Sequence, residues 1–283
     1  MMRLRVAWLS DGKRLHLQNG PLNLILQAFG PPSEVGRAYD AAIERARALV
    51  FELAEDVPRL QGGLTPNTAV GRRAAAACAE VTGALGPVTA VTGAVADEVL
   101  AALVQGGPLD RAFVNNRGCL AFHLAEGQSI TPLAMDWAEF PRQEAKLPIR
   151  SEVRTRALVC AGWRFDGMAF GYVDRIYTAA PSSAVAEAAL GSICARMVPA
   201  TGAQSVPATI IMPESVLGDL AVYPSRQDIS GDEAAVLIAQ GGEMADALFA
   251  AGTVTFAVME LKEAHFLASA PYLSLRSILS LEA

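Results

Sequence analysis

The sequence predicts an α+β fold in which helices pack on one side of a mostly antiparallel sheet. Three observations lead to this prediction. Short runs with apolar residues at every second position come in pairs, longer segments place apolar residues at helical spacing, and the two kinds of segment alternate along the chain. The 283 residues are 52% hydrophobic, which allows a sizeable core in one large domain or two small ones.

The first sixty residues predict a set of strands followed by a long helix. Alternating apolar residues indicate strands over 3–9, 14–18 and 22–27. The step Asn19-Gly20 between the last two is a strong hairpin signal, although Pro21 is less typical of a two-residue turn. We expect Ser33 to cap a helix that lasts until Pro58, and a glycine-rich loop to follow.

The rest of the chain continues the alternation of helices and strands. Helices are predicted over 67–81, 93–104, 182–197 and 230–250. Strands are predicted over 111–115, 119–125, 130–135, 157–161, 171–179 and 253–261. Ser182 or Ser183 is the expected N-cap of one helix, Ser230 opens a capping box with Glu233, and Gly252 ends that last helix. Segment 136–152 is expected to be a surface connection, and 199–228 to be irregular with short strands.

Composition excludes several classes of function. The net charge of −6, without a cluster of lysine and arginine, argues against a nucleic-acid partner. No uninterrupted apolar stretch of about 18 residues predicts a membrane span, and no signal peptide is recognised, so we expect a cytoplasmic protein. The four cysteines form no CxxC pair and are expected to be reduced and packed as small apolar residues. The three histidines are expected to be structural.

The first candidate binding motif is Thr92-Gly93, with Asp97 four residues after the glycine. A glycine where a helix begins lets backbone amides approach a phosphate, and the helix dipole favours an anion there. The alternative is that Gly93 simply opens a core helix and Asp97 caps its first turn.

The second motif is Asn115-Asn116-Arg117-Gly118-Cys119. Gly118 permits a positive φ, and Arg117 could bind a carboxylate or phosphate through two hydrogen bonds, or could be a solvated turn residue. Cys119 would need a neighbouring base to act as a nucleophile. His123 shares its strand face but lies roughly 13 Å along the strand, which is too far.

A third group comprises Gly171, Asp174 and Glu187. Two carboxylates beside a pocket could act as acid and base or as metal ligands. The alternative places Asp174 at the surface, paired with Arg175, and Glu187 on a solvated helix face.

In their order along the chain, these motifs resemble the ApbE-like superfamily, whose best-known members are magnesium-dependent FAD:protein FMN transferases. The segment from Val91 to Leu100, the turn at Asn115 to Cys119 and the segment from Gly171 to Glu187 carry the resemblance, which is greatest to an uncharacterised subfamily. It implies one compact unit over 1–283 with two T-fold-like halves, approximately 1–150 and 151–283, each a mostly antiparallel sheet with packed helices.

The resemblance also implies roles for residues, several of which are altered here. Thr92-Gly93 stands where transferases have Lys-Gly-Tyr at the flavin site, and Arg117 replaces the first of two glycines. Glu187 stands where an aspartate binds magnesium, and Gly191 replaces a threonine that also binds it. Thr92, Gly93, Asp97, Asn115, Arg117, Gly118, Gly171 and Asp174 are therefore the expected ligand-binding residues, and Glu187 the expected metal ligand.

The motifs and the resemblance suggest two functions, and the composition allows a third. The favoured one is a binding or accessory protein for a flavin- or pterin-type heterocycle with eroded transferase motifs, which the resemblance links to methanopterin-type one-carbon metabolism. The alternative is an active magnesium-dependent FAD:protein FMN transferase. The third is a structural homo-oligomer without a ligand, which the apolar content permits.

Overall fold

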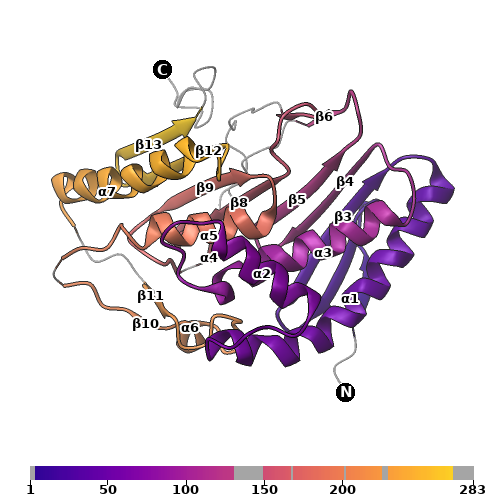
Figure 1. Ribbon diagram of the computed structural model, residues 1–283, viewed down its shortest axis with the longest axis horizontal. Coiled ribbons are helices and arrows are strands. Elements are labelled where there is room, and N and C mark those ends of the chain that lie inside the picture. The colour runs from indigo at the N-terminus through magenta and orange to yellow at the C-terminus, as the bar shows by residue number, and fades with distance from the viewer. Residues whose placement is uncertain (1–3, 131–148, 167, 201, 225–228, 270–283) are drawn as a thin grey trace.

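The protein is built around one antiparallel sheet of nine strands, which Figure 1 shows together with its helices. The computed structural model describes residues 4–130, 149–166, 168–200, 202–224 and 229–269. In sheet order the strands are β1 (Arg5–Trp8), β2 (Leu15–Asn19), β3 (Leu22–Phe29), β4 (Arg111–Asn116), β5 (Cys119–Leu124), β8 (Ala157–Ala161), β9 (Arg175–Ala180), β12 (Phe256–Leu261) and β13 (Ala264–Ser269). Four short strands form two small ribbons: β6 (Ser129–Ile130) with β7 (Ile149–Arg150), and β10 (Val206–Pro207) with β11 (Ala221–Val222).

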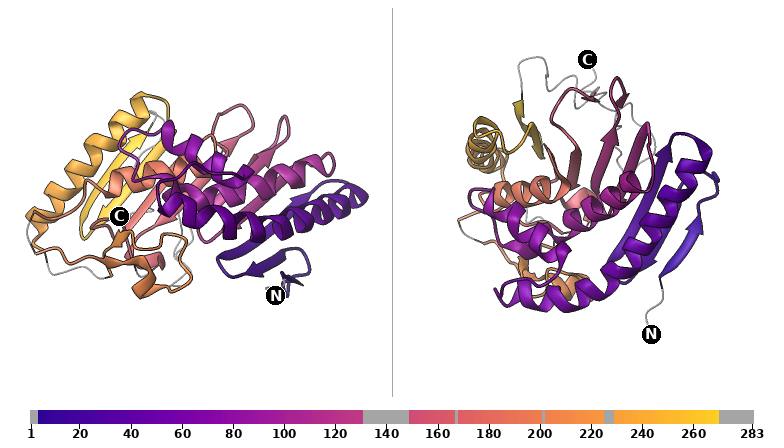
Figure 2. Two further views of the ribbon diagram at one scale, coloured as in Figure 1. Left: turned by 60° about the horizontal axis from the view of Figure 1, so that its bottom comes forward. Right: turned by 45° about the vertical axis from the view of Figure 1, so that its right-hand side comes forward.

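The long helices gather on one face of this sheet, as the two views in Figure 2 show. They are α1 (Pro32–Gln61), α2 (Ala69–Ala79), α3 (Val91–Gln105), which follows the 3₁₀ turn η1 (Pro87–Ala90), α5 (Ser183–Cys194) and α7 (Gly231–Ala250). The short helices α4 (Trp163–Asp166) and α6 (Ala208–Ile211) belong to connections. The main hydrophobic core lies between the helices and the sheet, and a smaller cluster around Phe122 lies on the other face.

The two halves of the chain have the same order of elements. Each contains a hairpin, two or more helices and a second hairpin: β2–β3 and β4–β5 in the first half, and β8–β9 and β12–β13 in the second. In each half the inner strands of the two hairpins pair antiparallel, β3 with β4 and β9 with β12. Pairing of β5 with β8 joins the halves into one sheet. The predicted α+β class, with two T-fold-like halves, is confirmed.

The first hairpin shows how the alternating pattern sets the register. Leu15 and Leu17 of β2, and Leu22, Leu24 and Leu26 of β3, are at most 1% exposed, while the residues between them are less buried. Asn19 pairs with Leu22, so Gly20 and Pro21 form a two-residue turn in which Gly20 has φ 52°. The hairpin prediction is confirmed despite the proline.

Several element boundaries differ from the predictions. Helix α1 begins at Pro32 with no side-chain cap, so Ser33 is not its N-cap. It continues past Pro58 to Gln61, because a proline near the end of a helix removes only one hydrogen bond and Leu60 is buried against the core. Helix α3 begins at Val91 rather than at Gly93. The caps by Ser182 and Ser230 are confirmed, with their hydroxyls accepting bonds from Val185 and Glu233.

The strand predictions also need correction at three places. Strand β9 begins at Arg175, not at residue 171. The predicted strand 130–135 overlaps β6 at Ile130 only, and its remainder lies outside the described residues, as does most of the predicted connection 136–152. Strand β13, with a turn at Lys262, was not predicted, since its sequence has little alternation.

One continuous helical segment, Pro87–Gln105, is long and apolar enough to cross a membrane by length and composition alone. Of its most apolar window, 61% is buried inside the protein, between α1, α2, α5 and the sheet. Contact with helices and with the sheet is the ordinary position of a core helix and explains the apolar composition of this segment.

A buried carboxylate fixes the start of α2 against α1. Asp56 of α1 is 1% exposed and accepts hydrogen bonds from the amides of Asn67 (2.9 Å) and Thr68 (2.8 Å) and from the Thr68 hydroxyl (2.5 Å). Burial alone would raise the pKa of Asp56, but these hydrogen bonds outweigh it and hold the pKa below its usual value. The carboxylate therefore closes the turn between the two helices.

We predict that Asp56→Ala lowers the free energy of unfolding by about 2–3 kcal/mol, because it removes the buried acceptor of three hydrogen bonds from Asn67 and Thr68. Asp40→Ala, at an exposed position of the same helix, is the control and should change stability by less than about 0.5 kcal/mol. Urea unfolding of both variants measures the difference. Equal effects would show that the Asp56 bonds contribute nothing beyond an ordinary surface residue.

Candidate functional site

The candidate site is built on an exchange of carboxylates between the first turns of α3 and α5. The amide of Gly93 in α3 donates to Oε2 of Glu187 in α5 at 2.7 Å. In return, Asp97 of α3 accepts from the amides of Ser183 (2.9 Å) and Ala184 (3.0 Å) in α5. The first amides of a helix have no partner within it and carry partial positive charge, so each helix satisfies the other with a carboxyl group.

This exchange requires that the two helices approach closely, and Gly93 makes the approach possible. A Cβ atom at residue 93 would lie 2.4 Å from the carbonyl oxygen of Ser183 and 2.7 Å from the nitrogen of Ala184. Only glycine fits there. Gly93 is therefore a packing residue in the first turn of α3, and its amide binds Glu187 rather than an external anion.

The exchange also exposes a short repeat that the sequence analysis did not detect. Gly93-Ala-Val-Ala-Asp97 and Ser183-Ala-Val-Ala-Glu187 each place a small residue four positions before an acid. In each helix the amide of the small residue donates a hydrogen bond to the acid of the other helix. The acid one turn later accepts a hydrogen bond from the small residue of that other helix. The shared Ala-Val-Ala followed by an acid was the signal that could have revealed the pair.

Burial changes the protonation of both acids. Asp97 is 8% exposed, and burial raises its pKa to about 6, although the amides of Ala184 and Ser183 oppose the rise. Burial raises the pKa of Glu187 further, to about 8, and the charge of Asp97 adds to the rise, while Gly93, Thr92 and Cys119 oppose it with hydrogen bonds. Glu187 retains partial exposure toward a pocket, yet protein atoms surround its carboxyl group closely. Burial therefore favours the protonated form of Glu187 more strongly than that of Asp97.

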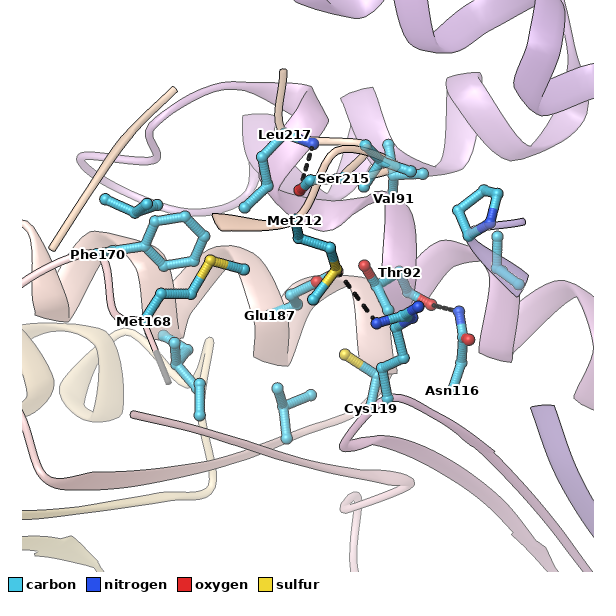
Figure 3. A pocket seen from close by; sticks show the side chains of 18 of the residues that line it. Val91, Thr92, Asn116, Cys119, Met168, Phe170, Glu187, Met212, Ser215 and Leu217 are labelled. Carbon is cyan, nitrogen blue, oxygen red and sulfur yellow. Dashed lines mark hydrogen bonds between the residues drawn. The ribbon is translucent and has the colours of Figure 1, made fainter. Parts of the chain in front are cut away.

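Glu187 borders a pocket of about 120 Å³ that lies between the sheet, the start of α3 and the segment after α5 (Figure 3). Apolar side chains form most of its wall, among them Val91, Met168, Phe170, Met212 and Leu217. Figure 3 shows Met168 and Phe170 on one side and Thr92, Asn116 and Cys119 on the other, with Met212 and Glu187 between them. The pocket thus has an apolar side and a polar side.

The polar side is held by hydrogen bonds to the backbone. Asn116 donates from its side chain to the carbonyl of Thr92 at 3.1 Å, and its Oδ1 accepts from the amide of Asn23 at 3.2 Å. The Thr92 hydroxyl and the Cys119 thiol both bond to the Glu187 carboxyl group. The partner of Cys119 is therefore Glu187 on another element, and not His123 on its own strand.

The turn between β4 and β5 carries the second predicted motif. Asn115 accepts the amide of Gly118 at 3.0 Å and so closes the turn. Gly118 has φ 88°, and a Cβ there would lie 2.9 Å from the Cys160 carbonyl oxygen. Of the three predicted residues only Arg117 lines the pocket, and its guanidinium donates to Sδ of Met212 at 3.3 Å. Asn115 and Gly118 serve the turn itself.

The third predicted group does not converge. Gly171 packs so closely under the end of α5 that a Cβ would lie 1.9 Å from the Cys194 carbonyl oxygen. Asp174 is 5% exposed, not at the surface, and accepts the amide of Lys262 at 2.8 Å in the β12–β13 turn. Neither residue lines the pocket around Glu187.

The residues present do not fit a magnesium ion. Magnesium is bound through one or two ionised carboxylates together with water and phosphate oxygens, and within the described residues no group of three or more histidine, cysteine, aspartate or glutamate side chains could hold a metal. Glu187, the predicted ligand, bonds to Gly93, while both oxygens of Asp97 accept backbone amides.

Most of the apolar wall could not be predicted from the sequence. Met168, Phe170, Met212 and Leu217 lie in segments without regular periodicity, so no pattern marked them as pocket residues. Asn116 was part of a quoted motif but was not singled out, although it fixes Thr92.

A family model described as "AbpE bacteria" matches residues 6–267, which confirms the resemblance inferred from the motifs. No curated protein matches the chain. Among solved structures, the flavinyl transferase ApbE of Pseudomonas stutzeri in its apo form is similar at 9% identity, with a TM-score of 0.43 over 100% of this chain and 98% of that chain. A mutant of the flavin transferase ApbE from Vibrio cholerae is similar at 11% identity, with a TM-score of 0.36 over 95% and 98% of the two chains.

We predict that Glu187 makes stability fall with rising pH. From the ordinary value of 4.5 up to the folded pKa of about 8, the unfolded chain has lost the proton and the folded chain still holds it, so the free energy of unfolding decreases. Glu187→Gln removes this term. The stability difference between the wild type and the variant should therefore decline by roughly 4 kcal/mol between pH 5 and pH 9 in urea unfolding. Glu243→Gln, at an exposed position in α7, is the control. Parallel pH curves would contradict the assignment.

A second prediction concerns the approach of α3 to α5. Gly93→Ala should destabilise the protein by about 2 kcal/mol or more, since the new methyl group meets the Ser183 backbone. Gly36→Ala, at an exposed and open position inside α1, should instead stabilise it by about 0.5–1 kcal/mol. Chemical denaturation distinguishes the two, and a stabilising effect at both positions would refute the close contact.

Proposed function

We propose that this chain, which belongs to the AbpE bacteria family, binds a flat heterocycle of the flavin or pterin type in the Glu187 pocket without magnesium. The proposal rests on what the carboxyl groups of Asp97 and Glu187 bind. The oxygens of Asp97 and Glu187 accept helix amides, and Glu187 also faces a pocket with an apolar wall. A ring-binding site remains where a metal site does not fit.

The chemistry of the wall suits a flat ring that has one polar edge. Phe170 and the thioethers of Met168 and Met212 provide polarisable surface, which favours contact with an aromatic face. Flavin and pterin rings carry N–H donors and carbonyl or nitrogen acceptors side by side along one edge. A carboxyl group that is protonated near neutral pH can donate and accept at once, so Glu187 complements such an edge.

The size of the pocket favours a small ring system. A cavity of about 150 Å³ is known to enclose benzene, and this pocket measures about 120 Å³ but opens to one side. Its enclosed part can take about one ring, with further rings and substituents at the open mouth. A two-ring pterin would enter more completely than a three-ring flavin, and an intact dinucleotide would extend outside.

Magnesium-dependent transfer of FMN from FAD to a protein remains the less favoured function. It would require Glu187 to leave Gly93 and further oxygen ligands to arrive. The link to methanopterin-type one-carbon metabolism stays a prediction from the resemblance, as does assembly into a homo-oligomer.

The test is a fluorescence titration of the purified protein with pterin, riboflavin and FAD, each with magnesium and with EDTA. We expect the ring ligands to bind with the same Kd under both conditions. Phe170→Ala should weaken binding about tenfold through loss of aromatic contact, whereas Phe51→Ala, 70% exposed on α1, should not. Binding of FAD alone, and only with magnesium, would refute the proposal and favour the transferase.

A further inference from the structure

Arg117 occupies an unusual backbone position beside the pocket. With Gly118 it forms the two-residue turn between β4 and β5, since Asn116 pairs with Cys119. Arg117 has φ 49° and Gly118 has φ 88°, so both residues are in the left-handed region. Such turns favour glycine or asparagine at both positions. A large cationic side chain is therefore present where the local backbone gives no reason for one.

The guanidinium reaches across the pocket instead of pairing with an acid. It donates to Met212 Sδ, a weak acceptor, and the described part of the chain gives it no ion pair. A guanidinium has five N–H donors in a planar fork that matches phosphate and carboxylate groups. Most of these donors remain available to a ligand.

The pocket wall carries one cationic and two acidic side chains among its described residues. Of the described residues that line the pocket, Arg117 is the only cation, and Glu187 and Glu214 are the acids. Glu187 accepts the amide of Gly93 at 2.7 Å, whereas Arg117 donates to Met212 at 3.3 Å. The carboxyl group and the guanidinium are thus held by different elements of the wall, where they can meet different parts of a bound molecule.

We propose that Arg117 makes this pocket selective for a heterocycle that carries an anionic tail, bound by its phosphate or carboxylate group. This inference rests on the proposed function, because it assigns the ring to the apolar wall and Glu187. The anionic tail of the ligand would then extend from the pocket on the side where Arg117 lies. A phosphate monoester gains most, since the fork can bind two of its oxygens at once.

Two matched pairs of ligands test the proposal, because each pair shares one ring system and differs in an anionic group: FMN against riboflavin, and 6-carboxypterin against pterin. In fluorescence titrations at low salt, we expect the charged member to bind about tenfold more tightly. A preference confined to FMN identifies phosphate as the tail, and one confined to 6-carboxypterin identifies carboxylate. The preference should weaken at high salt.

Variants of Arg117 test whether this side chain causes the tighter binding of the charged ligands. Arg117→Gln should reduce the ratio within each pair to about one and leave the Kd of the uncharged member within about twofold. Arg117→Asn suits the left-handed turn and should fold at least as well as the wild type, so it separates binding from stability. Arg154→Gln, at an exposed arginine away from the pocket, should keep the full ratio.

The possible failures are distinguishable. If no member of either pair binds, the proposed function itself fails. If the uncharged rings bind and the charged members bind no better, or if the ratio persists in Arg117→Gln and Arg117→Asn, the ring site stands and the role of Arg117 is overturned.

Discussion

The structure depends on the exchange of carboxyl groups between α3 and α5. Helix α3 belongs to the first half of the chain and α5 to the second, so this contact joins the helical layer just as the β5–β8 pairing joins the sheet. Gly93 permits the approach, and the Asp97 bonds to Ser183 and Ala184 satisfy amides that would otherwise be buried without partners. An unsatisfied buried amide costs about 1–3 kcal/mol, so loss of either acid would destabilise the contact between the two helices.

The same exchange determines what the pocket can do. At Glu187 the effect of burial on the pKa is larger than the opposing effect of the hydrogen bonds. The pKa of the carboxyl group therefore rises to about 8 even though three donors surround it. An acid in that state is a poor ligand for a hard cation but a good partner for a ring edge with mixed donors and acceptors. The apolar wall around Phe170 and the cation at Arg117 then divide the pocket into surfaces for a ring and for a charged substituent.

Local signals made much of the fold predictable. Alternating leucines with Asn19-Gly20 gave the first hairpin, and Ser182 and Ser230 gave two helix starts, because these features act within a few residues. The site was less predictable because its contacts are distant in sequence. Asp97 was expected to cap the first turn of its own helix or to bind a ligand. It instead accepts the amide of Ser183, 86 residues further along the chain, at the start of another helix. Gly171 and Asp174 were expected at a ligand and instead serve close packing and a turn. The wall residues Met168 and Met212 lie in irregular segments that carry no periodic signal.

The most direct test of the account is the titration of the Glu187 carboxyl carbon by NMR in protein labelled with ¹³C at glutamate side chains, assigned with Glu187→Gln. We expect a midpoint near pH 8 that millimolar magnesium does not change, because the carboxyl group is buried against Gly93 and is not part of a metal site. A midpoint near the ordinary value of 4.5, or one that magnesium lowers markedly, would contradict the account.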